Sequence, residues 1–191
     1  MKKIFFIFII ILAIVGAALG IYYSQSNKVY PEEQKETQEA FLVKDDFSVL
    51  LPQGWKESAG FQGVSAMATN AEEEITDPEA KKVNFRTYYS VTYDVLQGRT
   101  MEDYAEYVKE SLRQLLVSVD FVREEATELN GRDAHVIEIE LYQQGINLKV
   151  LMFLIKGEGD DLWLISFNTA QSNWDQYQDL FREIAASFET R

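Results

Sequence analysis

The sequence predicts an α+β domain built on an antiparallel sheet, and three observations lead to that fold class. Strand-like stretches follow one another over residues 132–169, with short turns between them and no helix. Two segments, 100–116 and 173–188, place apolar residues at helical spacing, so that each has one apolar face. The stretches 150–155 and 162–168 are apolar on both strand faces, so the sheet needs a cover on each side. The two helices provide those covers.

The stretch 132–169 divides into strands at well-marked turns. Asn130-Gly131 stands before the first strand, and this dipeptide favours a two-residue hairpin because both residues tolerate positive φ. Two glycine-containing turns follow, at 143–145 and 157–161. The sequence therefore predicts three consecutive antiparallel strands at 132–142, 147–156 and 162–168.

Both predicted helices begin with a capping signal. Thr100 is followed three residues later by Asp103, and Ser172 is followed in the same way by Asp175. The second helix carries an apolar stripe that consists of Trp174, Tyr177, Leu180, Phe181, Ile184, Ala185 and Phe188. We interpret this stripe as core packing rather than as a cofactor-binding surface. Each buried aromatic side chain then contributes roughly 1.5–3 kcal/mol to folding.

The first half of the chain adds further strands. Residues 47–51 are predicted as a short strand that ends at Pro52-Gln53-Gly54-Trp55, where proline and glycine force a turn. Residues 84–96 are rich in β-branched and aromatic residues and are predicted as a long strand. Shorter strands are predicted at 63–70 and 119–128. The acidic segment 71–82 is expected to be a solvated loop or short helical turn, with a site for a cation or a basic partner as the alternative.

The N-terminal residues predict a membrane span. Lys2 and Lys3 precede an uninterrupted apolar run over residues 4–23, which matches the thickness of a bilayer and favours a cytoplasmic N-terminus. We expect residues 1–23 to be a retained anchor, 24–43 a polar stalk and 44–191 the folded domain. The alternative is a cleaved signal peptide, with Ala18 and Gly20 before the cut. In either case the remainder of the chain is exported.

Composition excludes several classes of function. The chain has no cysteine, so a lipoprotein anchor on cysteine, a disulfide framework and thiol catalysis are excluded. Its formal net charge is −13, from 31 acidic and 18 basic residues, and no basic patch offsets it. Such a surface repels the phosphate backbone, so we expect no nucleic-acid partner.

Known catalytic and metal-binding patterns are missing from the sequence. The one histidine, His135, aligns with Ile137 and Ile139 on the more apolar strand face, so we expect it to be buried and hydrogen-bonded, with a catalytic base as the alternative. One histidine also excludes multi-histidine metal sites, and the turn at 157–161 lacks the ligand series of a calcium loop. We therefore assign no catalytic, cofactor-binding or metal residue, and we expect no cofactor.

One surface feature suggests binding. Arg86 and Tyr88 share a strand face with polar neighbours, and Tyr142 shares another with two glutamates. Tyrosine among charged residues is common in protein interfaces. Arg86, Tyr88 and Tyr142 are accordingly the candidate binding residues, provided that no helix covers those faces. The other interpretation, which we favour, is that these faces pack beneath one of the two helices.

The motif at Pro52-Gln53-Gly54-Trp55, together with the order of elements that follows it, resembles the PsbP-like (Mog1/PsbP/DUF1795) domains. The resemblance covers about residues 45–189, and its one compact motif is the strand and turn at 47–55. It implies an α/β/α sandwich around an antiparallel sheet. It also implies binding rather than catalysis, because members of this family bind photosystem II or a small GTPase. No stretch of the chain matches a partner-binding motif of those members, so no functional residue is carried over.

These observations predict a non-enzymatic, membrane-tethered extracytoplasmic domain that binds another envelope protein or helps to assemble or maintain a complex. The alternative is a small-ligand-binding module or a divergent hydrolase that uses a carboxylate-lined pocket. The two hypotheses differ in what they expect of the surface. A deep cleft with two facing carboxylates or His135 would favour the enzyme, and a flat patch edged by aromatic residues would favour partner binding.

Overall fold

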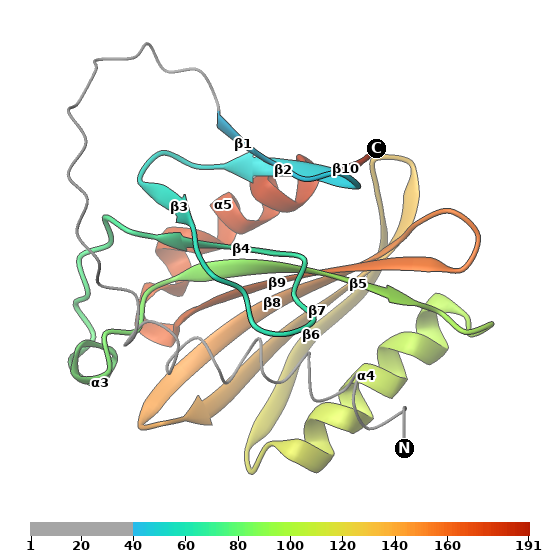
Figure 1. The fold of residues 1–191 in the computed structure, drawn as a ribbon. Coiled ribbons are helices and arrows are strands. Elements are labelled where there is room, and N and C mark those ends of the chain that lie inside the picture. Colours follow the sequence, from blue (N-terminus) through green and yellow to red (C-terminus); the bar gives the residue numbers. More distant parts are fainter. Residues whose placement is uncertain (1–39) are drawn as a thin grey trace.

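The computed structural model describes residues 40–191 (Figure 1). The predicted membrane span at residues 1–23 and the predicted stalk up to residue 39 lie outside the described residues. Among the helices from residue 40 onward, none is long and apolar enough to cross a membrane.

The main sheet has seven strands, and every neighbouring pair is antiparallel. Its order is β3-β4-β5-β9-β8-β7-β6, with bounds Trp55–Glu57, Ala66–Asn70, Tyr88–Val95, Asp161–Ala170, Ile146–Lys156, Arg132–Gln143 and Val119–Leu129. The predicted meander is β7, β8 and β9. β8 and β9 are buried on both faces along most of their length, as their continuous apolar sequence predicts. β5 begins at Tyr88 rather than at residue 84, because the chain leaves a short helix there with Asn84 at φ 53°.

A second, three-stranded sheet has the order β1-β2-β10, with bounds Ala40–Val43, Phe47–Leu51 and Glu189–Thr190. The predicted strand at 47–51 thus belongs to this sheet and not to the main one. β1 lies within the span predicted as stalk (24–43), so residues 40–43 are part of the folded domain. Leu42 attaches β1 to the domain, because its side chain packs into the core while those of Phe41 and Val43 stay exposed.

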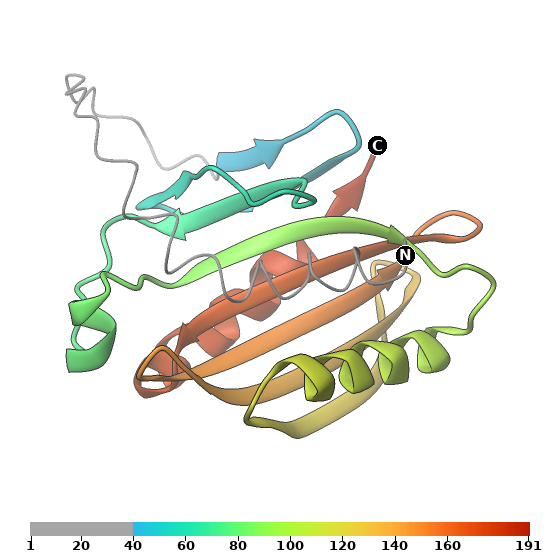
Figure 2. The ribbon, with the colours of Figure 1, turned by 60° about the horizontal axis from the view of Figure 1, so that its bottom comes forward.

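Helices cover the main sheet on opposite faces (Figures 1 and 2). α4 (Met101–Leu115) packs on one face over a core that includes Ile137, Ile139 and Met152. α5 (Trp174–Ala186) and the small sheet pack on the other face. The remaining described helices are the short α3 (Pro78–Lys82) and the single 3₁₀ turn η2 (Gln171–Asn173). The domain is therefore a mixed α/β fold with antiparallel sheets.

The aromatic stripe of α5 packs in the core, as predicted. The Phe181 ring is fully buried and stacks on Phe167 of β9 at a centroid distance of 4.9 Å. Tyr177 and Trp174 lie 5.8 Å and 6.2 Å from the same ring. These residues fix α5 to the centre of the sheet.

The two predicted helix caps have different outcomes. Thr100 caps α4, and its Oγ1 accepts a hydrogen bond from the Asp103 backbone N–H at 3.1 Å. The predicted Ser172 cap of α5 is wrong, because the chain first makes the turn η2 and Asn173 takes the cap position without a side-chain capping bond. The Ser172 hydroxyl instead donates to Asp77 Oδ2 at 3.3 Å.

The predicted hairpin at Asn130-Gly131 is confirmed, since both residues have positive φ, at 52° and 74°. The Asn130 side chain also makes tertiary hydrogen bonds, which the dipeptide alone does not predict. Asn130 Nδ2 donates to the carbonyl oxygens of Ala186 and Phe188 at 2.8 Å and 3.1 Å. The β6–β7 turn thereby holds the C-terminal end of α5 and the start of β10.

Candidate functional site

The three predicted binding residues do not form one surface. Tyr88 is completely buried in the core on the α4 side, so its assignment to a surface is wrong. Arg86 is half-buried, and its guanidinium donates to the Glu73 carbonyl. Tyr142 on β7 is 59% exposed, but β9 and β8 lie between it and β5. The sequence could not show that Phe85 and the α4-side core cover Tyr88.

The strand face beside Tyr142 carries charges that neutralise one another. Lys149 of β8 stands opposite Glu140 and diagonal to Glu138, at N–O distances of 3.2 Å and 2.8 Å. Its Nζ also lies 4.6 Å from the centre of the Trp174 ring. Burial disfavours the charged ammonium, but the two glutamates outweigh it and raise the pKa of Lys149. The charges on this face, which we call the self-paired ladder face, are therefore paired with one another, and little charge remains free to bind a partner.

His135 has the structural role that its strand position predicts. It is buried, and its Nε2 lies 2.7 Å from Glu124 Oε1 on β6. The other Glu124 oxygen accepts a hydrogen bond from Lys109 of α4. The three side chains join α4, β6 and β7. Burial raises the pKa of Glu124, but the bonds from Lys109 and His135 outweigh burial and leave it below its ordinary value.

This lowered pKa predicts a pH dependence of stability. A carboxyl whose pKa is lower in the folded than in the unfolded chain stabilises the fold above the unfolded value, about 4.3, and loses that contribution as the pH falls through the folded value. We expect Glu124→Gln to lower the free energy of unfolding above about pH 5, and the difference from wild type to shrink below about pH 4. Urea titrations from pH 3 to 7 measure this. Glu125→Gln, at an exposed neighbour, is the control, and a difference for Glu124→Gln that stays constant across this range would contradict the expectation.

The acidic segment 71–82 contains the predicted short helical turn, which is α3, and is exposed along most of its length. Its centre is neither solvated nor an open cation site. Glu73 is buried, and its carboxylate accepts hydrogen bonds from the backbone N–H and hydroxyl of Thr87 and from Asn173 Nδ2, the last two at 2.7 Å and 3.1 Å. Asp77 caps α3 by accepting from two backbone N–H groups. Within residues 40–191, no group of three or more histidine or acidic residues is placed to hold a metal ion.

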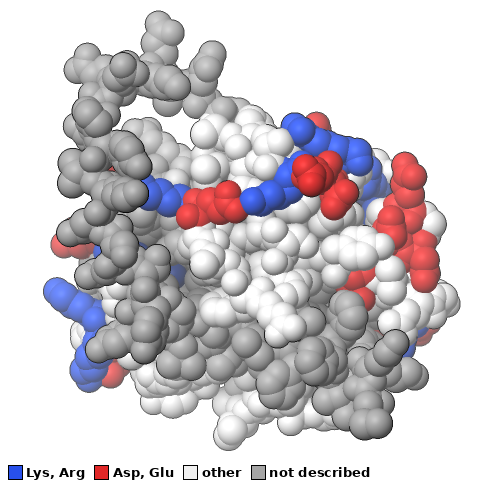
Figure 3. All heavy atoms as spheres, in the orientation of Figure 1, with Lys and Arg blue, Asp and Glu red and all other residues white. Residues whose placement is uncertain are grey.

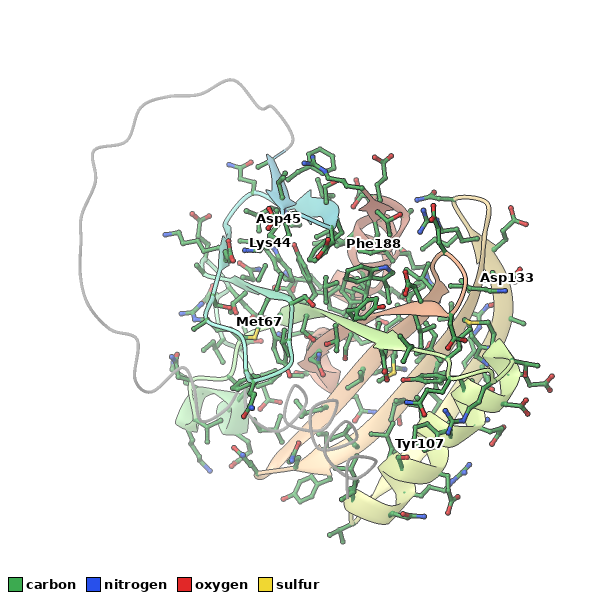
Figure 4. The ribbon with its side chains drawn as sticks, turned by 45° about the vertical axis from the view of Figure 1, so that its right-hand side comes forward. Lys44, Asp45, Met67, Tyr107, Asp133 and Phe188 are labelled. Carbon is green, nitrogen blue, oxygen red and sulfur yellow. The ribbon has the colours of Figure 1, made fainter. Side chains whose placement is uncertain are left out.

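A hollow of about 460 Å³ opens where the small sheet meets one end of the main sheet, and we call it the junction cleft. Its walls come from the β1–β2 turn, the C-terminal residues, the start of β7 and the β8–β9 turn. Figure 4 shows this region, with Phe188 between the hairpin that carries Lys44 and Asp45 and the hairpin that carries Asp133. The lining residues are Asp46, Tyr93, Arg132, Gly157, Glu158, Asp161, Trp163, Thr190 and Arg191.

The floor of the junction cleft is aromatic. Trp163 is buried and packs against Phe47 at 5.2 Å and Phe188 at 5.6 Å between ring centres. Tyr93 meets the edge of Trp163 at 5.2 Å and is 40% exposed. Its hydroxyl donates to Asp161 Oδ1 at 2.6 Å, and this bond raises the pKa of Tyr93. The tyrosine ring is thereby held in place at the mouth of the cleft.

The walls of the junction cleft carry charges of both signs that are not paired with one another. Arg132 donates one hydrogen bond to the Thr190 hydroxyl, and the Arg191 backbone N–H donates to Asp46 O at 2.9 Å. Within the described part of the chain, neither guanidinium forms an ion pair with a carboxylate. Arginine, tyrosine and tryptophan are the residues most enriched where proteins bind partners. The junction cleft is therefore the strongest candidate site.

Sequence reasoning missed this site. Only the turn at 157–161 was singled out, as a carboxylate-rich loop, while the other lining residues lie in separate strands and turns. No local pattern connects Asp46 with Arg132 and Arg191, because their proximity depends on β10 pairing with β2. Figure 3 shows that lysines, arginines and acidic residues alternate across the upper part of one face rather than separating into blocks.

The sequence model of the PsbP family matches residues 39–190. The chain belongs to the PsbP family. The matched range includes every residue that lines the junction cleft except Arg191. This PsbP domain also shares the predicted Mog1/PsbP fold with solved structures, although no curated protein matches the sequence.

Three solved structures illustrate that likeness. Cyanobacterial PsbP (CyanoP) from Synechocystis is 18% identical with a TM-score of 0.57, over 81% of this chain and 92% of that one. LpqN of Mycobacterium tuberculosis, described as involved in cell envelope biogenesis, is 12% identical with a TM-score of 0.57, over 80% and 90%. The Saccharomyces cerevisiae Ran-binding protein Mog1p is 13% identical with a TM-score of 0.54, over 82% and 96%. At these identities the likeness concerns the PsbP fold alone.

Proposed function

We propose that this PsbP-family chain is a non-enzymatic, membrane-tethered extracytoplasmic factor that binds an envelope protein and helps to assemble or maintain a complex there. The observation that carries the proposal is the junction cleft, with its aromatic floor and its two arginines without a carboxylate partner among the described residues. The family supports a binding role, and so do two proteins of similar fold, the Ran-binding protein Mog1p and LpqN, which is involved in cell envelope biogenesis. The apolar run at residues 4–23 supports the tether.

The buried ionisable groups support binding over catalysis because they are engaged in the fold. His135 shares Glu124 with Lys109, and Glu73 accepts bonds from Thr87 and Asn173. Asp94 accepts bonds from the Tyr104 hydroxyl and from the Val95 backbone N–H. A general base must reach the proton that it abstracts, and these groups already hold structural donors.

The alternative function, binding of a small ligand, has one observation in its favour. A volume of about 460 Å³ falls within the range of small-molecule sites, and three carboxylates line the cleft. Asp161 among them is held by the Tyr93 hydroxyl, and the unpaired charges and the exposed tyrosine resemble an interface more than an enclosed pocket. His135 lies outside the lining. We therefore rank partner binding first.

Site-specific photo-crosslinking tests the proposal. A photoreactive phenylalanine analogue at position 93, at the mouth of the cleft, is expected to give a discrete crosslinked protein in intact cells that sediments with the membrane fraction. The same analogue at position 142 is a matched control, because Tyr142 is also an exposed strand tyrosine but lies on the self-paired ladder face. Mass spectrometry of the crosslinked band identifies the partner.

Three results would contradict the proposal. Crosslinks from position 142 but not from position 93 would move the binding surface to the open strand face. Discrete crosslinks from neither position in membranes that hold the intact chain would remove the protein-binding role. If the chain is found only in the soluble exported fraction, the N-terminal segment is a cleaved signal peptide and not a tether.

A further inference from the structure

A second hollow lies next to the junction cleft. This hollow has a volume of about 480 Å³ and is lined by residues 43–47 with Ser65 and Arg191. Asp46 and Arg191 line both hollows, so the two are neighbours around the β1–β2 turn. We call the two adjacent hollows together the groove, and its lining reaches from the β8–β9 turn to Val43 at the end of β1. Two neighbouring hollows suit an extended ligand better than a compact one.

Within residues 40–191, no strand pairs with the outer edge of β1, the strand that borders the second hollow. The bond from Lys44 N–H to Phe47 O at 2.8 Å fixes the hydrogen-bonding alternation of the β1–β2 pair. By this alternation the backbone N–H and C=O groups of Phe41 and Val43 point away from β2. The side chains of the same two residues are 45% and 51% exposed. An exposed edge with unpaired backbone groups can accept another strand.

The lining of the groove carries charges of both signs. Two arginines, Arg132 and Arg191, come from the start of β7 and the C-terminal end, and three carboxylates come from Asp46, Glu158 and Asp161. Trp163 and Tyr93 form the aromatic floor. A ligand with charges of only one sign would meet like charges in this lining. A ligand with both signs, separated by an apolar residue, would complement both sets of charges and the floor.

We propose that this groove binds an extended, mixed-charge segment of the partner polypeptide. A carboxylate of the segment pairs with Arg132 and Arg191, an apolar side chain lies on Trp163 and Tyr93, a basic side chain faces Glu158, and the segment continues along the outer edge of β1. The inference rests on the proposed function, because it names the part of the partner that the cleft recognises.

Binding of fluorescein-labelled peptides to the full chain in detergent micelles tests the inference. The probe is an eight-residue peptide with one aspartate and one lysine on either side of a phenylalanine. Two neutral analogues replace the aspartate by asparagine or the lysine by glutamine. Fluorescence anisotropy gives the Kd of each peptide for wild type, Arg132→Ala, Glu158→Gln and the control Arg123→Ala. Arg123 is an exposed β6 arginine that pairs with Glu125 and does not line the groove.

We expect each charge of the peptide to strengthen binding only when the opposite charge of the groove is present. Loss of the peptide aspartate weakens binding to wild type by about tenfold but causes little further loss with Arg132→Ala, and the peptide lysine is coupled in the same way to Glu158. Arg123→Ala keeps the wild-type pattern. Thermal unfolding of each variant shows whether it is folded.

The inference is overturned if no peptide binds saturably, or if the effect of each peptide charge is the same in wild type and in the wall variants. The crosslinking experiment separates this failure from that of the proposed function. A partner still captured from position 93 would leave the protein-binding role in place and would exclude only the mixed-charge mode of recognition. If no peptide binds and no partner is captured from position 93, both proposals are rejected.

Discussion

Phe181→Ala is expected to destabilise the domain by about 3–5 kcal/mol, the largest single effect predicted here. The ring is fully buried and contacts the rings of Phe167, Tyr177 and Trp174. Its removal leaves a cavity between α5 and the centre of the main sheet, where the surrounding rings cannot collapse without losing their own contacts. Urea unfolding followed by tryptophan fluorescence measures the change, and the melting temperature should fall by roughly 10 °C.

Two further variants make that measurement specific to packing. Phe181→Leu keeps much of the buried volume and should cost clearly less than Phe181→Ala. Asp179→Ala alters an exposed position of the same helix and should leave the stability within about 0.5 kcal/mol of wild type. Equal stabilities for Phe181→Ala and Asp179→Ala would show that α5 does not seal this face of the sheet.

Glu73→Ala is expected to cost roughly 2–4 kcal/mol, although it changes a residue within a run of three glutamates. The substitution removes the acceptor of three hydrogen bonds and leaves the buried Thr87 backbone N–H without a partner. The carboxylate also lies close to the start of α5, because it accepts a hydrogen bond from Asn173 at 3.1 Å. Burial, together with the nearby Glu73 charge, raises the pKa of Tyr177 to about 12. The loop before α3 should therefore loosen from β5 and from the start of α5.

The neighbouring glutamates provide matched controls for Glu73. Glu72→Ala and Glu74→Ala remove the same charge from the same loop, but their side chains are exposed, so each should change the free energy of unfolding by less than about 0.5 kcal/mol. Hydrogen exchange at the Thr87 amide gives a local measurement, since Glu73→Ala should speed it and the controls should not. Three equal effects would mean that net charge, and not the buried acceptor, is responsible.

Local signals in the sequence predicted much of the secondary structure, because they act within a few residues. Asn130 and Gly131 both tolerate positive φ and adopt it in the turn, and Thr100 accepts a hydrogen bond from the N–H of Asp103 inside the same helical turn. The continuous apolar stretches of β8 and β9 also predicted that the sheet would be covered on both faces. His135 was correctly expected to be buried, since its neighbours on the strand face are apolar.

Such local signals could not predict the candidate site. β1 and β10 contain four and two residues, too few for a periodic pattern to be recognised. Tyr88 and Tyr142 look alike in sequence, as tyrosines among polar neighbours, yet the first is buried and the second is exposed. Glu73 is indistinguishable from Glu72 and Glu74 until Thr87 and Asn173 are brought beside it.

The sequence by itself determined the strands of the meander, the two covering helices and an acidic chain without cysteine, because periodicity, capping and composition are properties of neighbouring residues. Only the tertiary structure decided which charged groups were paired and which were left open. The pairing of β10 with β2 and of β5 with β9 brings together residues that are distant in the chain, and the junction cleft exists only where those pairings meet.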